Sequence, residues 1–209
     1  MPGRCDEVAG VLSNALLCTV CLGAAVQTFQ INRGAAAGFL LQALVPLMET
    51  AALLAAPLGL SLDARPPDDS WVSTVVGLPL LVFGFHWLNG DCSTANLLLG
   101  GALLLTASSG YFTEEGKAVV AHSVTLLASI TILIVSVFTG NVCGVVGSLL
   151  VGTAGLLEGA TLQRLLLLRK KDLLRALMAA AHLALQWALQ RQHQELEQGP
   201  VGLGAEASG

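Results

Sequence analysis

The chain has 209 residues, of which 54% are hydrophobic and only 11% are charged. A water-soluble domain carries about 25% charged residues, since its surface must face water, so the composition excludes an ordinary soluble protein. The 10 basic and 14 acidic residues give a net charge of -4, and the lack of a basic face with interleaved aromatic residues argues against nucleic-acid binding.

Six apolar runs approach or exceed the length that a helix needs to cross a bilayer. A hydrocarbon core of about 30 Å takes about 20 helical residues. Alternation of apolar and polar residues, which would indicate strands, is absent. We therefore predict an all-α polytopic transmembrane helical bundle of about six spans. In chain order the runs cover residues 8–29, 35–60, 71–88, 95–112, 118–138 and 142–163, and the fourth is the shortest.

Short turns rich in Asn and Gly join these runs in pairs. They lie at residues 32–34, 89–91 and 140–141, and both residue types tolerate the left-handed backbone that tight turns need. The pattern predicts three hairpins whose turns all fall on one side of the membrane.

The distribution of Lys and Arg predicts the orientation, because these residues prefer cytoplasmic loops. With six spans and both termini inside, Arg33 is the single cation outside. We expect an integral protein of an endomembrane or the plasma membrane with a cytoplasmic C-terminus. The cations expected inside are Arg4, Arg65, Lys117, Arg164, Arg169, Lys170, Lys171, Arg175 and Arg191.

The N-terminal run has an alternative interpretation as a signal peptide. Arg4 precedes an apolar run that ends near Gly23-Ala24-Ala25, as in a cleaved leader. The run is long for a leader, and Asp6 and Glu7 lie where positive charge is expected. Cleavage would leave five spans.

A polar helix is predicted after the sixth run. Leu174, Leu177, Leu185 and similar residues recur at helical spacing, and Arg175 and His182 share the opposite side. This pattern is typical of an amphipathic helix lying in the membrane interface. A seventh span, the alternative, would require partners for Arg175 and His182. We divide the chain into a transmembrane domain at 1–168, an amphipathic cytoplasmic helix at 169–198 and a disordered tail at 199–209.

Small residues at four-residue spacing predict close helix packing in the sixth run. Gly140, Gly144, Ser148 and Gly152 lie on one face, where helix backbones can approach closely in lipid. This face serves packing within the chain or, alternatively, a homo-oligomer or membrane-protein partner. Pro46, Pro57 and Pro79 can each kink a span.

Ionisable residues within spans are expensive and are functional candidates. Glu49 and Glu158 lie on helices of the same direction, at similar depth in the cytoplasmic half. If these helices adjoin, the two carboxyls could share a proton or bind a cation. Otherwise each would be a protonated acid bonded to a backbone carbonyl or to Gln42.

The five cysteines do not form a disulfide scaffold pattern. Cys92 and Cys143 follow two of the outer turns, where a disulfide could join two hairpins, and the alternative is two buried thiols. Cys18 and Cys21 lie within an apolar run and are expected to be packing residues. No His, Cys and carboxylate set has zinc spacing, and we expect no cofactor.

Several stretches resemble the transmembrane protein 276 group. They are residues 32–42, residues 77–101 with Phe85-His86-Trp87 and Asn89-Gly90-Asp91, residues 137–140 and residues 164–168. The resemblance implies a small multi-pass membrane protein and identifies no functional residue.

Motifs of soluble enzymes are missing, including nucleophile elbows, paired-histidine zinc motifs and phosphate loops. The leading hypothesis is therefore a non-enzymatic interaction or assembly component of a membrane. The alternative is a small transporter or proton-coupled channel that uses Glu49 and Glu158, and an intramembrane enzyme comes third.

Overall fold

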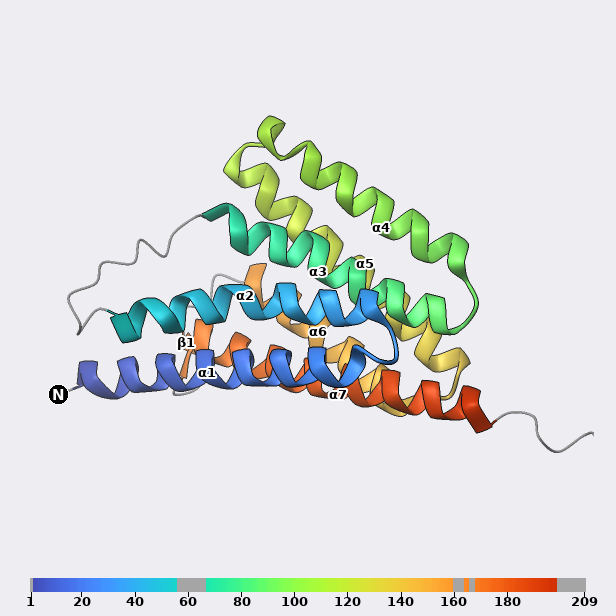
Figure 1. Cartoon of the computed structure of the whole chain (residues 1–209). Helices are drawn as coiled ribbons and strands as arrows, with labels where there is room; N and C mark the ends of the chain where they lie inside the picture. The colour runs from blue at the N-terminus through green and yellow to red at the C-terminus, as the bar shows by residue number, and fades with distance from the viewer. Residues whose placement is uncertain (1, 56–66, 160–163, 166–167, 199–209) are drawn as a thin grey trace, which may run out of the picture.

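The computed structural model describes residues 2–55, 67–159, 164–165 and 168–198. Helices account for nearly all of this described part (Figure 1). A 3-10 turn, η2 (Ser109–Tyr111), follows the fourth helix, and two-residue strands β1 (Arg164–Leu165) and β2 (Leu168–Arg169) pair antiparallel before the last. The helices are α1 (Pro2–Thr28), α2 (Arg33–Ala55), α3 (Pro67–Leu88), α4 (Cys92–Ala107), α5 (Glu114–Phe138), α6 (Val142–Gly159) and α7 (Lys170–Gln198).

The predicted hairpins are confirmed, and their turns share one design. Gly90 and Gly140 adopt positive φ angles of 79° and 65°, which end one helix without the strain that a side chain would add. An Asx residue then caps the next helix by accepting a backbone N–H three residues on. The capping residues are Asn32, Asp91 and Asn141, at 2.9, 3.1 and 3.2 Å respectively.

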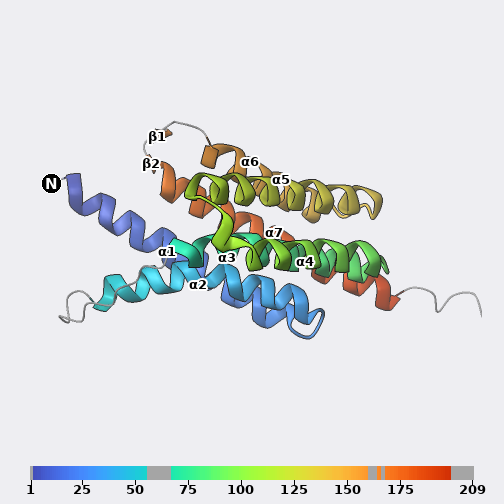
Figure 2. The same cartoon turned by 90° about the horizontal axis from the view of Figure 1, so that it is seen from above.

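Six of the helices form a closed ring. Around the ring the order is α1, α2, α3, α5, α6 and α7, and α7 packs back on α1. Seen from above, the α1–α2 and α5–α6 hairpins lie on opposite sides, with α3 and α7 between them (Figure 2). Helix α4 lies outside the ring against α3. The ring is filled by large apolar side chains, among them Phe39, Leu81, Phe85, Ile132 and Leu185.

Glycines allow α2 and α3 to cross closely. A Cβ atom added to Gly38 would lie 2.8 Å from the backbone oxygen of Gly77, and one added to Gly84 would lie 2.7 Å from the Cβ of Ala35. Such contacts leave no room for a side chain, so the two backbones pack directly, as expected for helices in lipid.

The helices fit the predicted membrane bundle. Within the described residues, five are long and apolar enough to cross a membrane: α1, α2, α3, α5 and α6. Helix α4 is a shorter apolar helix of 16 residues, about 24 Å long. The ends predicted for the second and sixth runs, at 56–60 and 160–163, and Pro57 and the predicted tail at 199–209 fall outside the described residues.

Helix α7, which covers the predicted amphipathic helix, is part of the bundle. Helix α7 does not lie apart from the bundle, since it packs along α1 and α6. Its last turns lie beside the hairpin turns, because Asn141 donates a hydrogen bond to the carbonyl of Ala188 at 2.8 Å. The beginning of α1 and the end of α7 therefore lie at opposite ends of the bundle (Figure 1). From the sequence we expect the polar stripe of this helix at the membrane interface, whereas the buried part of the stripe faces other helices.

The small-residue face of α6 is occupied within the chain. A Cβ at Gly144 would collide with the hydroxyl of Ser136, and one at Gly152 would lie 2.6 Å from that of Ser129. Ser148 is fully buried, and its carbonyl accepts a hydrogen bond from Ser129. Of the four positions predicted as an oligomer seam, only Gly140 lacks a neighbour within 4 Å of an added Cβ. This face packs on α5, which is the alternative of packing within the chain.

Candidate functional site

A polar cavity of about 330 Å³ lies between the ring helices, towards the end where α1 begins. All ring helices contribute to its wall, and carboxylates, cations, amides and hydroxyls lie among apolar side chains. Its polar lining residues are Asn14, Gln42, Glu49, Ser70, Ser73, Thr74, Thr125, Glu158, Lys171 and Arg175.

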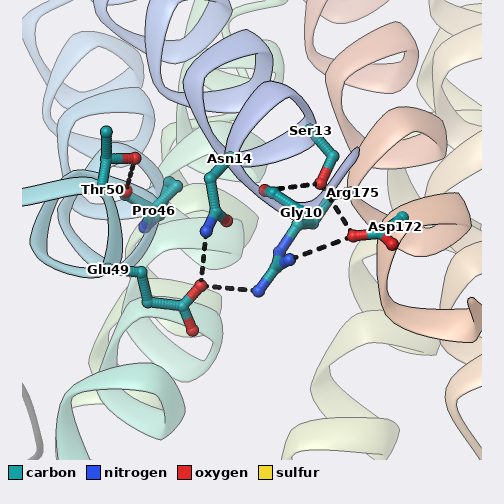
Figure 3. Close-up of polar contacts among 8 residues, drawn as sticks. All are labelled: Gly10, Ser13, Asn14, Pro46, Glu49, Thr50, Asp172 and Arg175. Atoms are coloured by element: carbon teal, nitrogen blue, oxygen red, sulfur yellow. Dashed lines mark hydrogen bonds and ion pairs between the residues drawn. The ribbon is translucent and has the colours of Figure 1, made fainter. Parts of the chain in front are cut away.

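Glu49 is held by two neighbouring helices. Its Oε2 accepts hydrogen bonds from the Nδ2 of Asn14 on α1 at 2.9 Å and from Nη2 of Arg175 on α7 at 2.6 Å (Figure 3). The side chain of Glu49 is 42% exposed and that of Arg175 is 21% exposed. Both bonds involve a charged group and are stronger than neutral hydrogen bonds, so the carboxylate is fixed in one orientation at the cavity wall.

Arg175 also faces a second carboxylate. Its Nη1 lies 3.4 Å from Oδ1 of Asp172, one turn earlier on α7. Asp172 is only 7% exposed, and the same oxygen lies 3.0 Å from the hydroxyl of Ser13 on α1. Figure 3 shows these contacts as one chain of polar groups that joins α2, α1 and α7. Each buried charge therefore has a partner, which its burial requires.

Glu158 comes to the same cavity from α6. It is exposed, and its backbone carbonyl accepts a hydrogen bond from Nζ of Lys170 at 2.7 Å. The structure thus brings Glu49 and Glu158 to one cavity, although α2 and α6 are not neighbours in the ring. They are not joined directly: the ionic partner of Glu49 is Arg175.

Gln42 lines the cavity but does not bond to either glutamate. Its Nε2 donates to the carbonyl of Ser73 on α3 at 3.0 Å, and the hydroxyl of Ser73 donates to the carbonyl of Leu41 at 2.7 Å. This reciprocal pair fixes α2 against α3. One turn later Pro46, also in the wall, has no N–H to donate to the carbonyl of Gln42.

Sequence reasoning missed Arg175, Asp172, Lys171, Asn14 and Ser13 as members of this site. The polar face of α7 was assigned to the membrane interface, and Ser13 and Asn14 are small polar residues in an apolar run. The signal was the single polar face of α7, since a stripe of charges and amides can match polar residues on a neighbouring helix as well as it can face water.

Of the two alternatives for Cys92 and Cys143, the disulfide is not formed, since both thiols are free, and both are partly exposed. Cys92 begins α4, which packs on α3, whereas Cys143 begins α6, which packs on α5 and α7. Cys18 and Cys21 are free and buried. No group of three or more His, Cys, Asp or Glu side chains that could hold a metal ion occurs among the described residues.

The turn between α3 and α4 carries a further ionic contact. Nδ1 of His86 lies 3.2 Å from Oδ2 of Asp91. The pKa of Asp91 lies below its ordinary value, first because of the side chain and backbone N–H of Thr94 and then because of His86. This contact is far from the cavity and stabilises the turn.

Comparison with known proteins decides the family. The chain is 47% identical over 192 residues to transmembrane protein 276 of Bos taurus, covering 91% of this chain and 96% of the relative. The proteins of the same name from Homo sapiens and Mus musculus are each 46% identical over 191 residues, with the same coverage. The chain belongs to the transmembrane protein 276 family.

Family membership agrees with the resemblance found in the turn and helix segments, and together with the apolar helices it identifies a multi-pass membrane protein. The printed names of the transmembrane protein 276 relatives state no substrate or activity. No family model matches the chain, and no solved structure matches it.

Proposed function

We propose that this protein is a non-enzymatic membrane carrier that binds a small polar solute in the cavity of the helix ring. The observation that supports this function best is the meeting of Glu49 and Glu158, from α2 and α6, in one polar cavity. Its volume of about 330 Å³ lies at the lower end of the range for small-molecule sites.

The charges of the cavity favour a zwitterionic solute over a bare cation. Two carboxylates, Glu49 and Glu158, face two cations, Lys171 and Arg175. Glu49 is already paired with Arg175, so a cation bound there would compete with a guanidinium. A solute that carries both signs can contact an acid and a base without leaving a buried charge unpaired.

The part of the cavity wall that α2 forms supports the carrier hypothesis. Pro46 lies beside the cavity and leaves the carbonyl of Gln42 without its usual intrahelical donor. Interrupted helices at substrate sites offer free backbone groups to the solute.

We place the cavity end of the bundle in the cytoplasm. The loops and helix starts at this end carry most of the Lys and Arg residues, which favours the cytoplasmic side. The cavity would then open towards the cytoplasm, in an endomembrane or the plasma membrane.

Uptake into proteoliposomes tests the carrier function. The full chain is reconstituted and assayed with radiolabelled glycine, choline and inorganic phosphate as zwitterionic, cationic and anionic probes. We expect uptake of glycine above that of empty liposomes, and its loss in Glu158→Gln. The control is Glu115→Gln, since Glu115 is an exposed carboxylate at the start of α5. If the wild-type protein takes up none of the three probes, the carrier function is wrong.

A second candidate, an interaction or assembly component, rests on α4. This helix packs outside the ring, and a Cβ at Gly100 or Gly101 would meet no atom within 4 Å. Small residues on an outer face permit close approach of a partner helix in lipid. A partner that copurifies in mild detergent with wild type but not with Gly101→Leu would support this function. This function is wrong if every protein that copurifies with wild type also copurifies with Gly101→Leu.

A further inference from the structure

The polar side chains of α7 point into the bundle. Asp172 is 7% exposed and His182 is fully buried, and Gln186 and Gln192 are also buried. The ring of His182 packs edge-on against Phe39 of α2, at a centroid distance of 5.7 Å. These groups are shielded from solvent along the whole helix, so water is not what stabilises the polar face.

Other helices supply partners for most of these groups, at both ends of the bundle, whereas His182 pairs with the carbonyl of Met178 on its own helix. At the cavity end Ser13 donates to Asp172, and Arg175 donates to Glu49. At the turn end Gln186 and Gln190 both donate to Oε1 of Gln27 near the end of α1, at 2.5 and 2.9 Å. Helix α7 therefore runs the length of α1.

The outward face of α7 is apolar. From Lys171 to Arg191 its exposed residues recur at helical spacing, and all those between the two cations are apolar: Ala176, Ala180, Leu183 and Trp187. Leu183 is 37% exposed and Trp187 is 58% exposed. A surface helix of a soluble protein has the opposite arrangement, with its polar face outward.

The length of this apolar face matches a bilayer. Lys171 and Arg191 are 20 residues apart, which corresponds to about 30 Å of helix, the thickness of the hydrocarbon core. Cations at such positions reach the head groups on either side, and a Trp near the end of a span suits the interface.

We infer that α7 is a membrane-spanning helix whose apolar outer face contacts lipid acyl chains, so that α1 begins and α7 ends on opposite sides of the membrane. Mean hydropathy does not reveal this span, because its polar residues are counted as if lipid had to solvate them. Most of these residues have partners on α1 and α2, as expected for polar groups within a bilayer.

This topology keeps the cation bias that sets orientation. Among the described residues, Arg33 and Arg191 lie at the turn end, and the other cations lie at or beyond the cavity end. With the cavity end in the cytoplasm, α7 ends on the non-cytoplasmic side.

Labelling of the two ends tests the inference in the full chain. One epitope tag precedes residue 2 and another follows residue 198, and cells are permeabilised selectively at the plasma membrane or completely. We expect antibody access to the two tags from opposite sides of the membrane that holds the protein. Access to both tags from the same side would overturn the inference, whatever the solute assay shows.

A pair of substitutions on α7 provides an independent readout. Leu183→Glu puts a charge on the outer face at mid-helix, and we expect insertion of α7 to fall on the order of a hundredfold. The control Leu183→Phe keeps an apolar face and should insert as wild type does. Insertion is read from glycosylation of an Asn-x-Thr acceptor placed after residue 198 in microsomes. No glycosylation of the wild-type acceptor would contradict the inference, and so would equal glycosylation of Leu183→Glu and Leu183→Phe.

Discussion

The guanidinium of Arg175 lies 2.6 Å from the carboxylate of Glu49, although 126 residues separate them in the chain. This contact ties α7 to α2 across the ring and forms part of the cavity wall. Partial exposure weakens such a pair relative to a fully desolvated one, but the hydrogen bond from Asn14 adds to it.

A double-mutant cycle measures the coupling between these two residues. We expect Glu49→Gln and Arg175→Gln each to lower the free energy of unfolding by about 1–3 kcal/mol, since each removes the shortest contact of its partner. The double variant should lose less than the sum, with a coupling of about 1 kcal/mol. Unfolding in mixed detergent micelles provides the measurement. Additive losses would show that the two side chains do not interact.

The crossing of α2 and α3 should not tolerate a methyl group. In Gly38→Ala the new Cβ would meet the rigid backbone oxygen of Gly77, so the helices must separate, at a cost of about 1–3 kcal/mol. Gly23→Ala in α1 is the matched control, since its Cβ would meet no atom within 4 Å. It should be neutral or stabilising by up to about 1 kcal/mol. Equal melting temperatures for both variants would contradict the crossing.

The lowered pKa of Asp91 predicts that the stability of the turn between α3 and α4 depends on pH. Hydrogen bonds from Thr94 and the contact with His86 lower its pKa in the folded protein, so ionised Asp91 stabilises the turn. This contribution is present above the ordinary carboxyl pKa of about 4 and is lost as the pH falls through the lowered value.

The variant Asp91→Asn removes the charge of this side chain but keeps a residue that can cap α4. Asn occupies the equivalent capping positions at 32 and 141, so the variant should fold normally. The difference in melting temperature between wild type and Asp91→Asn should change in acid, with wild type losing its advantage. A difference independent of pH would show that the charge of Asp91 contributes nothing.

The thiols of Cys92 and Cys143 should react separately. Peptide mapping under non-reducing conditions, after alkylation in denaturant, should find both cysteines alkylated and no cross-linked peptide. Cys92→Ser should change the free energy of unfolding by no more than about 0.5 kcal/mol. A disulfide would instead make reduction cost about 2–5 kcal/mol.

The sequence allowed the membrane helices and their pairing to be predicted well. Apolar runs and turns such as Asn89-Gly90-Asp91 are local signals, because each residue acts on its own helix end. The shared depth of Glu49 and Glu158 also followed from counting residues along straight helices.

The ring arrangement could not be predicted, because it depends on which helices adjoin. Nothing local in residues 92–107 indicates that α4 lies outside, or that α7 takes its place beside α1. The placement of Asp172 and Arg175 failed for the same reason: their partners, Ser13 and Glu49, are on the first two helices. A polar stripe reports that a helix needs polar surroundings but not whether water or protein provides them.

The closure of the ring by α7 has a consequence for biosynthesis. Helices α1 and α2 leave the ribosome first, and Ser13, Gln27 and Glu49 then have to remain in the membrane without the contacts that only α7 supplies. Contacts this distant in sequence form late in folding. The polar groups of the N-terminal hairpin therefore lack these contacts until α7 is made. A chain whose synthesis stops before α7 leaves these groups exposed to chaperones and to degradation.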